Sequence, residues 1–570
     1  MKRILWSAIS VVAFAAAAFW AVGQMEQSQM QQLPSLMPTG ALLSIEARDF
    51  SSLLKDWNSS AEKRAWVDGD DYQEFSRSRL LIRLSQAQGE FSAAAGISTD
   101  DSLLNAVAGK QSCLAIYDIG NLEFLYVTRM SQHDAENTPL WQIRAKFEQR
   151  SEGAAQFYVR QDPQSGRVAA FAAANGWMIL GTREDLVAGV LNRLQSATGR
   201  SLADEAWYAD SVKQASGAPG DLRMVLNLGK LVPSPYFRSY WVQRNITEMK
   251  QYASAVSDLY RSSESYREER VLLRKPDTAA PPSGDVKALA SLAPADADFY
   301  SAWLISDPET VLVALRDTLL EVKPAAVESS WSAPPPQPET QAGSATMLEE
   351  RIDQAPVVVR QADPFEPLRA LLRSAQPAQM LQVGSAIASD KSSFVRIQMG
   401  MVIVARQPWD ALAVQRAVSS ALQPGLTAGQ MGLGWIERSG KSGEYFALDG
   451  RVPLYFAVRG ERLYFANTKD LLEQMLGPEQ ATPAAEQDGV TFTAVFRHSN
   501  SEQQIFQALF SRLDRAGNTP GSQAEGQTPP FFSGNLDSLN RMFRDVERET
   551  VSEHDQGAKV LETVSYDWSQ

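Results

Sequence analysis

Cysteine and histidine are almost absent from this 570-residue sequence, and their scarcity excludes several kinds of site. Cys113 is the single cysteine, so the chain can form no intramolecular disulfide and no cysteine-rich metal site. The three histidines, His133, His498 and His554, lie far apart, and none belongs to an H-x-x-x-H pair. We therefore predict no metal site and no cofactor, and we expect packing alone to stabilise the fold.

Positive charge is also in short supply. The sequence has 54 Lys and Arg against 67 Asp and Glu, a formal net charge of −13. Proteins that bind nucleic acid draw much of their affinity from basic side chains on phosphates, so this balance argues against a nucleic-acid partner. Apolar residues make up 44%, which is ordinary for a globular protein and excludes a fibrous or wholly disordered chain.

Residues 1–24 are predicted to insert into a membrane. Lys2 and Arg3 precede the uncharged stretch Ile4–Gly23, whose 20 residues can cross about 30 Å of hydrocarbon as a helix. This stretch is longer than the apolar region of about 7 to 15 residues in a cleaved signal peptide, which favours an uncleaved signal anchor. Because basic ends tend to stay in the cytoplasm, we expect a single-pass protein of the cytoplasmic membrane with its bulk on the periplasmic or extracellular side.

A signal peptide is the alternative for the same segment. Ala21 and Gly23 are small residues at the two positions that matter for a cut before Gln24, and cleavage there would release a secreted protein. In both cases residues 25–35 are predicted to form a polar spacer between the membrane segment and the fold.

The rest of the chain contains the same order of predicted elements twice. In the first part Leu42–Arg48 has the pattern of a half-buried strand, and Asp49 can cap the helix that follows. In the second part Asp298–Ile305 has the pattern of a strand, and Asp307-Pro308 can open a helix. Both parts therefore begin with a strand followed by a helix.

A second pair of segments supports the repeat. Arg167–Leu191 and Val452–Leu476 each have the pattern of a hairpin followed by a helix, and Phe171 aligns with Phe456. We predict an α+β fold of two similar, largely antiparallel units with helices on one face of each sheet. The predicted units are residues 36–272 and 288–570.

Proline-rich segments mark the joints of this arrangement. Residues 273–287 are predicted to form a linker between the two units. Two further segments, near 324–345 and 516–530, are predicted to be disordered insertions within the second unit.

Local patterns predict two more features of the fold. Within Asp71–Ala95 a helical stripe, which includes Leu84, Ala87 and Phe91, is assigned to core packing. Arg548–Glu553 and Ala558–Trp568 are assigned to a closing hairpin.

Two segments have less regular patterns. The aromatic residues from Tyr236 onward are predicted to open a helix that continues through Leu259. Met399-Gly400 is predicted to form the turn between two strands, Phe394–Ile397 and Met401–Ala405.

A serine motif is the basis of the one enzymatic hypothesis. Ser52-Leu-Leu-Lys55 matches the S-x-x-K of penicillin-interacting serine enzymes, and Lys441-Ser-Gly443 could replace their K-T-G. No S-x-N lies between the two motifs, and Ser52 is compatible with the wet side of a surface helix.

A phosphate-binding loop is also incomplete. Lys441 and Ser442 match the end of a P-loop, but the first glycine of that motif is replaced by Trp435. A glycine-rich hairpin loop is the simpler interpretation of this segment.

The opening pattern L-x-P-x-x-A occurs at Leu36–Ala41 and again at Leu292–Ala297, each time before a strand and a helix. With an N-terminal anchor, this arrangement resembles a family of exported bacterial proteins known only as a domain of unknown function. The resemblance implies an exported protein and brings no activity, cofactor or catalytic residue.

We predict a non-enzymatic, membrane-anchored envelope protein whose exported, duplicated domain binds or scaffolds another envelope component. Its predicted partners are the membrane, through the N-terminal helix, and an envelope protein. The alternative is an exported serine hydrolase or acyltransferase that uses Ser52 and Lys55.

Overall fold

The computed structural model of the chain describes most residues between Leu33 and Trp568. The described ranges are 33–60, 63–64, 67, 72, 79–196, 199–215, 219–240, 249–262, 265–278, 282–320, 363–387, 396–426, 433–449, 453–477, 489–497 and 546–568. The predicted membrane segment 1–24 and the predicted insertions near 324–345 and 516–530 lie outside these ranges. Within them, no helix is long and apolar enough to cross a membrane.

The chain divides into two compact units. The first comprises Met1–Pro281, Ala388–Val395 and Gly489–Gln570, and the second comprises Pro282–Ile387 and Arg396–Asp488. The C-terminal segment therefore packs with the N-terminal part of the chain, whereas the sequence assigned it to the second predicted unit.

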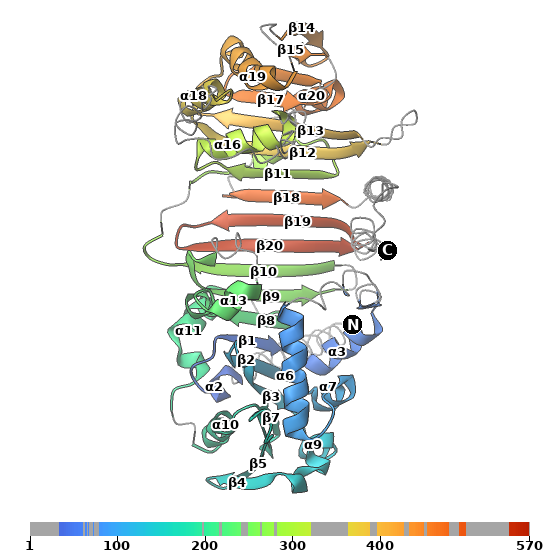
Figure 1. The fold of residues 1–570 in the computed structure, drawn as a ribbon, viewed down its shortest axis with the longest axis vertical. Helices are drawn as coiled ribbons and strands as arrows, with labels where there is room; N and C mark the ends of the chain where they lie inside the picture. The colour runs from blue at the N-terminus through green and yellow to red at the C-terminus, as the bar shows by residue number, and fades with distance from the viewer. Residues whose placement is uncertain are drawn as a thin grey trace, which may run out of the picture. The chain divides into compact units, whose positions relative to one another are not determined.

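In the described part of the first compact unit, thirteen strands belong to one antiparallel sheet, whose arrangement Figure 1 shows. Along the sheet their order is β4, β5, β6, β7, β3, β2, β1, β8, β9, β10, β20, β19, β18. The strands are β1 (Leu43–Ala47), β2 (Ser112–Asp118), β3 (Glu123–Arg129), β4 (Glu148–Glu152), β5 (Ala155–Gln161), β6 (Val168–Ala174), β7 (Trp177–Gly181), β8 (Leu222–Leu226), β9 (Tyr252–Arg261), β10 (Ser265–Arg274), β18 (Phe492–Arg497), β19 (Val546–Asp555) and β20 (Lys559–Trp568).

Helices cover this sheet. They are α2 (Leu33–Leu36), α3 (Phe50–Ser59), α6 (Arg79–Ala95), α7 (Asp101–Val107), α8 (Gln132–Glu136), α9 (Pro139–Gln142), α10 (Glu184–Ser196), α11 (Ala206–Gln214), α12 (Leu228–Leu231) and α13 (Pro235–Tyr240). Helix α2 begins inside the predicted polar spacer, and its Leu33 is fully buried. The spacer prediction is therefore wrong at its C-terminal end.

The second compact unit also combines helices with an antiparallel sheet. Its strand order is β14, β15, β16, β17, β13, β12, β11. The elements are α15 (Lys287–Ala290), β11 (Phe299–Leu304), α16 (Pro308–Leu315), η3 (Arg316–Leu320), α18 (Glu366–Ala375), β12 (Pro377–Ile387), β13 (Arg396–Ala405), α19 (Ala411–Leu426), β14 (Ile436–Gly440), β15 (Gly443–Leu448), β16 (Leu454–Arg459), β17 (Arg462–Ala466) and α20 (Lys469–Leu476).

The strand order from β14 to β11 is the same as the order from β4 to β1 in the first compact unit. The hairpin β6–β7 with helix α10 occupies the place that β16–β17 with α20 occupies in the second unit. Phe171 lies opposite Leu180 in one hairpin, and Phe456 lies opposite Phe465 in the other. These are the two segments whose sequences align.

Helices cover both faces of the sheet rather than one. In β6 the side chains of Ala170 and Ala172 pack with α10, whereas those of Ala169 and Phe171 pack in the cluster that contains Phe91 of α6. A strand that is buried on both faces has a nearly continuous apolar sequence, and β6 has such a sequence. Its pattern therefore does not indicate that only one face of the sheet is covered. The prediction of helices on one face is wrong.

Two predicted elements differ from the structure. The aromatic residues from Tyr236 lie in helix α13 as predicted, but β9 is a strand rather than a continuation of that helix. Its alternate residues Ser254, Val256 and Asp258 are buried. An alternation of apolar and polar residues with a period of two indicates a strand. Because two of the buried residues in β9 are polar, the sequence does not show that alternation.

Met399-Gly400 lies inside β13 rather than in a turn, because β13 pairs along its length with β12. A Cβ atom on Gly400 would lie 2.7 Å from the Cε of Met475, so the glycine allows close packing of α20 on the strand. The closing hairpin is confirmed as β19 and β20. Strand β10 extends to Arg274, inside the start of the predicted linker.

Strand β20 of the closing hairpin pairs with β10 on its other side. Several charged side chains of β10, β19 and β20 lie close together. Arg274 forms an ion pair with Asp555 in which both side chains are nearly buried. Glu553 lies directly opposite Glu562, and like charges in that position destabilise a sheet. Burial, followed by the charges of Glu562 and Asp555, raises the pKa of Glu553 from 4.5 to about 7 despite the nearby Arg274.

A raised carboxyl pKa makes the folded state bind the proton more tightly than the unfolded state does. Stability is therefore expected to fall as the pH rises from about 4.5 through about 7. Glu553→Gln should reduce this fall, measured as the difference between urea midpoints at pH 5 and pH 8. Glu547→Gln, at an exposed position of the same strand, is the matched control and should not change it. An equal fall in the wild type and the Glu553 variant would contradict the assignment.

Candidate functional site

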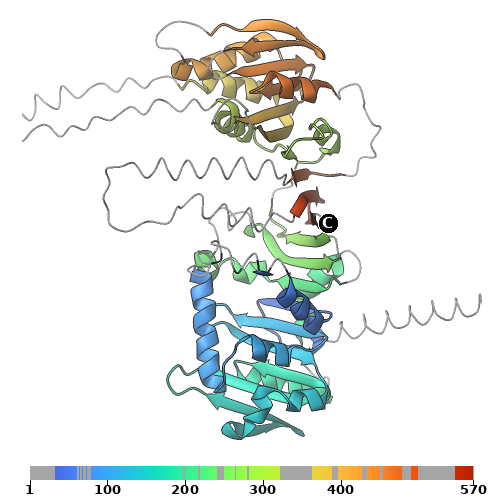
Figure 2. The same cartoon turned by 90° about the vertical axis from the view of Figure 1, so that its right-hand side faces the viewer.

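A cavity of about 650 Å³ lies between helix α6 and the sheet of the first compact unit. Helix α6 forms one wall with Leu84, Ala87, Gln88 and Phe91. Their spacing of three and four residues places them on one face of the helix. Figure 1 shows α6 running across the strands, and Figure 2 shows it as a separate layer beside the sheet.

The opposite wall of the cavity is an apolar part of the sheet. Ile45, Leu114, Ile116 and Phe124 come from β1, β2 and β3, and all four side chains are only half-buried. Central strands normally bury such residues against a covering helix, because apolar area in contact with water is unfavourable. All four side chains line the cavity, and Leu114 and Phe124 also pack against the hydrophobic cluster that contains Phe91. Leu103 and Val107 of α7 add further apolar surface at one end.

The same face of the second compact unit is packed. When the paired strands are aligned, Ile45 corresponds to Ser301 and Leu114 to Gln382. The Nε2 of Gln382 donates to the Oγ1 of Thr318 in η3 at 3.4 Å. The buried residues that α16, η3 and α18 contribute to this core are Val311, Leu312, Leu315, Leu319, Leu320, Leu368, Leu372 and Ala375. Ile45 and Leu114 therefore stand where the second unit has polar residues, whereas Ser112 and Tyr126 of the same face stand where it has Met380 and Met401 of the packed core.

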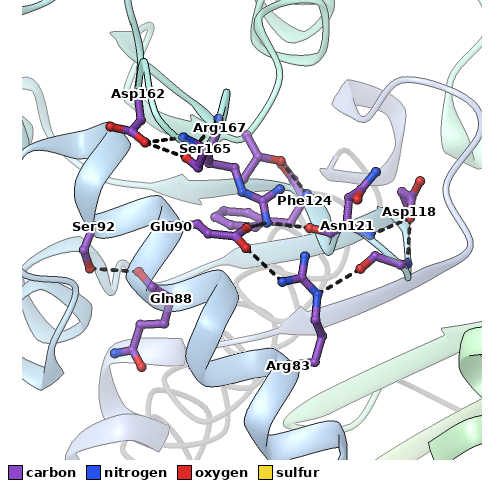
Figure 3. A network of polar contacts seen from close by, with 12 residues as sticks. Arg83, Gln88, Glu90, Ser92, Asp118, Asn121, Phe124, Asp162, Ser165 and Arg167 are labelled. Carbon is purple, nitrogen blue, oxygen red and sulfur yellow. Dashed lines mark hydrogen bonds and ion pairs between the residues drawn. The ribbon is translucent and has the colours of Figure 1, made fainter.

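One flank of α6 is held by arginines. The Nη1 of Arg83 lies 3.0 Å from Oε1 of Glu90, and the Nη2 of Arg167 lies 2.9 Å from Oε2 of the same carboxylate (Figure 3). Arg167 also donates to the carbonyl oxygen of Asn121 at 2.5 Å. Burial opposes ionisation of Glu90, but the hydrogen bonds and charges of Arg83 and Arg167 outweigh it and lower the pKa of Glu90. The cluster of three side chains carries one net positive charge.

Arg167 has an incomplete set of partners. Its side chain is 8% exposed, and its Nε is buried with no hydrogen-bond partner among the described residues. An N–H that is removed from water without a partner costs about 1–3 kcal/mol. Arg167 and Thr182 line the apolar cavity and also a second, polar cavity of about 450 Å³ beside it. The polar cavity is lined as well by the charged residues Arg83, Glu90, Glu123, Arg183, Glu184 and Asp185.

The other flank of α6 is held by uncharged groups. The Nε2 of Gln88 donates to the carbonyl oxygen of Thr99 at 2.5 Å, and the hydroxyls of Ser92 and Thr99 lie 2.5 Å apart. Asp100 follows and caps α7 by accepting from the backbone of Ser102 at 3.0 Å. This hydrogen-bonded carboxylate, whose pKa is lowered first by the Ser102 side chain, lines the cavity on the side away from the arginines.

A second polar cluster lies in the interior of the first unit. Glu46 is 4% exposed and accepts from the hydroxyl of Tyr208 at 2.6 Å. Arg223 donates to both carboxylate oxygens of Asp258 at 2.8 Å. Desolvation raises the pKa of Glu46 despite the charge of Arg223. The four residues of this cluster come from four separate segments of the chain, so no local pattern in the sequence indicated the cluster.

The residues of the enzymatic hypothesis lie on the surface. Ser52 and Lys55 are exposed on α3, whose N-terminus Asp49 caps as predicted by accepting from the backbone N–H of Ser52 at 3.0 Å. No hydrogen bond joins the two side chains among the described contacts, and an activated lysine normally needs a desolvated site. Lys441 and Ser442 form the turn between β14 and β15, so the hairpin interpretation of the P-loop-like segment is confirmed.

Other reactive groups offer little chemistry. Cys113 is fully buried, and desolvation raises its thiol pKa well above the ordinary value. Within the described ranges, no group of three His, Cys, Asp or Glu side chains is arranged to hold a metal ion. The apolar stripe of α6 was expected to pack in the core, and the structure shows that only part of it does so. Its Phe91 is buried, but Leu84 and Ala87 line the cavity.

Comparison with known proteins places this fold only distantly. No protein-family model matches the sequence, and no curated protein matches it. Two crystal forms of a protein designated TP0453 are similar to 43% of this chain, at 8% and 7% identity. They are covered over 80% and 81% of their lengths with TM-scores of 0.24 and 0.23, values too low to support any conclusion about function.

Two alanines of α6, seven residues apart, test whether the cavity is open space. Ala94→Leu adds volume to a packed core, where overpacking costs about 1–3 kcal/mol of stability. Ala87→Leu adds the same volume to the cavity and should leave stability unchanged or raise it by up to about 1 kcal/mol. Urea unfolding followed by circular dichroism measures both. Equal destabilisation by the two substitutions would show that the cavity is not open.

Proposed function

We propose that this chain is a non-enzymatic, membrane-anchored envelope protein that binds an apolar part of another envelope component in the cavity beneath α6. The observation that carries the proposal is the cavity itself. Its volume of about 650 Å³ is within the range of about 300–1,000 Å³ typical of ligand sites, and its walls are almost wholly apolar. Burial of an apolar chain there would remove water from both the chain and the half-exposed sheet residues.

The comparison of the two compact units supports a binding role. Ile45 and Leu114 stand where the second unit has Ser301 and Gln382, whereas Ser112 stands where it has Met380. The face is apolar in both units, but in the second unit it is covered by a packed core and in the first it lines a cavity. We infer that the two repeat units predicted from the sequence, residues 36–272 and 288–570, arose by duplication. We also infer that the first of them specialised for binding.

Location at the membrane is the second part of the proposal. The apolar stretch Ile4–Gly23 is long enough to anchor the chain, and the basic residues before it favour an external fold. A binding site tethered to a bilayer surface would meet membrane-derived ligands at a high effective concentration.

Binding is tested with the neutral fluorescent probe N-phenyl-1-naphthylamine. The full-length protein, held in an amphipol, should bind the probe with an increase in fluorescence over empty amphipol. Ala87→Trp places an indole in the cavity and should weaken probe binding at least about tenfold, or by about 1.4 kcal/mol.

Gln86→Trp is the matched control, because it adds the same side chain to an exposed position of the same helix. It should bind the probe as the wild type does. Unchanged binding by Ala87→Trp, or an equal loss in both variants, would contradict the proposed site.

Location is tested by adding protease to spheroplasts. Because residues 25–570 are proposed to lie outside the cytoplasmic membrane, the full-length band should disappear while a cytoplasmic marker survives. Survival of the full-length band, with a periplasmic marker cleaved, would exclude an external location.

A further inference from the structure

We propose that the ligand of this cavity is a single-chain amphiphile with an anionic oxygen headgroup, oriented with its headgroup at Arg167 and its chain beneath α6. This inference rests on the proposed function and adds the chemical class and the direction of the ligand. A fatty-acid carboxylate and the phosphate of a singly acylated lipid share this chemistry.

The arginine flank of the cavity contains charges of both signs. Arg83 and Arg167 share one carboxylate, that of Glu90, whereas the neighbouring Arg183 is paired with two, those of Glu123 and Asp185. The excess positive charge therefore lies at Arg83 and Arg167, and an anionic oxygen is favoured there, as a charge-assisted acceptor, rather than beside Arg183.

The hydrogen-bonding capacity of Arg167 identifies the contact. Its side chain is more than nine-tenths buried, and its Nε has no partner among the described residues. Arg167 is also one of two residues that line both the apolar cavity and the polar cavity beside it. A headgroup at that junction could leave its chain in the apolar cavity and reach the guanidinium.

The opposite flank sets the direction. Asp100 and Asp101 line the cavity on the side of α7. Asp101 is paired with Lys63 at 3.6 Å, and the hydrogen bonds from Ser102 and Leu103 favour the ionised form of Asp100. An anion placed there would meet like charge, so the apolar end of the ligand belongs near Leu103 and Leu104 of α7. The cavity thus has a basic flank and an acidic flank, and an anionic amphiphile fits in one orientation.

Displacement of the neutral probe measures the selectivity. Dodecanoate and dodecyl phosphate represent the two anionic sources, dodecanol is the neutral analogue, and dodecyltrimethylammonium is the cationic one. The wild type should bind at least one anionic ligand at least about tenfold more tightly than dodecanol and should bind the cation most weakly.

Arg167→Met should remove this preference and retain dodecanol binding. Arg79→Met is the matched control, because it removes the same charge from an exposed position of α6 that lines neither cavity. It should keep the preference. Retention of the preference in Arg167→Met, or an equal loss in both variants, would overturn the proposed contact.

Photo-crosslinking of the wild-type chain tests the direction without a substitution. A fatty acid with a diazirine beside its carboxyl group should label peptides around Asn121 and Arg167, and one with a diazirine at its methyl end should label α7. The reverse pattern would overturn the inference.

The outcomes separate the two proposals. Equal binding of anionic, neutral and cationic chains would overturn the anionic headgroup and leave the apolar binding function standing. Failure of every chain to displace the probe, together with failure of the probe to bind, would overturn both.

Discussion

A β-sheet that carries apolar side chains on both faces needs cover on both faces, and this requirement organises the two compact units. Helices α10 and α20 cover one face at equivalent places. On the other face the second unit is filled by the core around Leu312 and Leu372, whereas the first unit has α6 standing over a hollow. The same strand order therefore yields a solid layer in one unit and a lined cavity in the other.

The cavity remains open because polar contacts on the two sides of α6 hold the helix, rather than packing of the apolar face between them. Phe91 and Ala94 pack against the sheet at the C-terminal half of the helix. Arg83 and Glu90 fix one flank to the β2–β3 turn and to Arg167, and Gln88 fixes the other to Thr99. Polar contacts at the flanks hold the helix, leave the Nε of Arg167 without a partner among the described residues, and leave the apolar face between them free to meet a ligand. This division gives apolar burial the larger part of any affinity and gives the charged flank its selectivity.

Sequence patterns succeeded where apolar residues follow a simple period. The hairpins β6–β7 and β16–β17 with their helices were predicted because alternating strands and capped helices leave local signatures. The same reasoning failed at β9, where buried Asp258 interrupts the apolar alternation. Its burial depends on Arg223 of the neighbouring strand β8, a partner 35 residues away. Because the sequence does not show the pairing of Asp258 with Arg223, the helix was predicted to continue through Leu259.

The sequence by itself determined the α+β content, the antiparallel hairpins and the recurrence of one strand and helix order, because each depends on neighbours a few residues apart. It also identified the stripe of Leu84, Ala87 and Phe91. Only the tertiary structure decided that part of this stripe faces a cavity, because an apolar helix face has the same pattern over a hollow as over a packed core. The arginine flank has the same origin: Arg167 and Glu90 are 77 residues apart and become partners only when β6 pairs into the sheet.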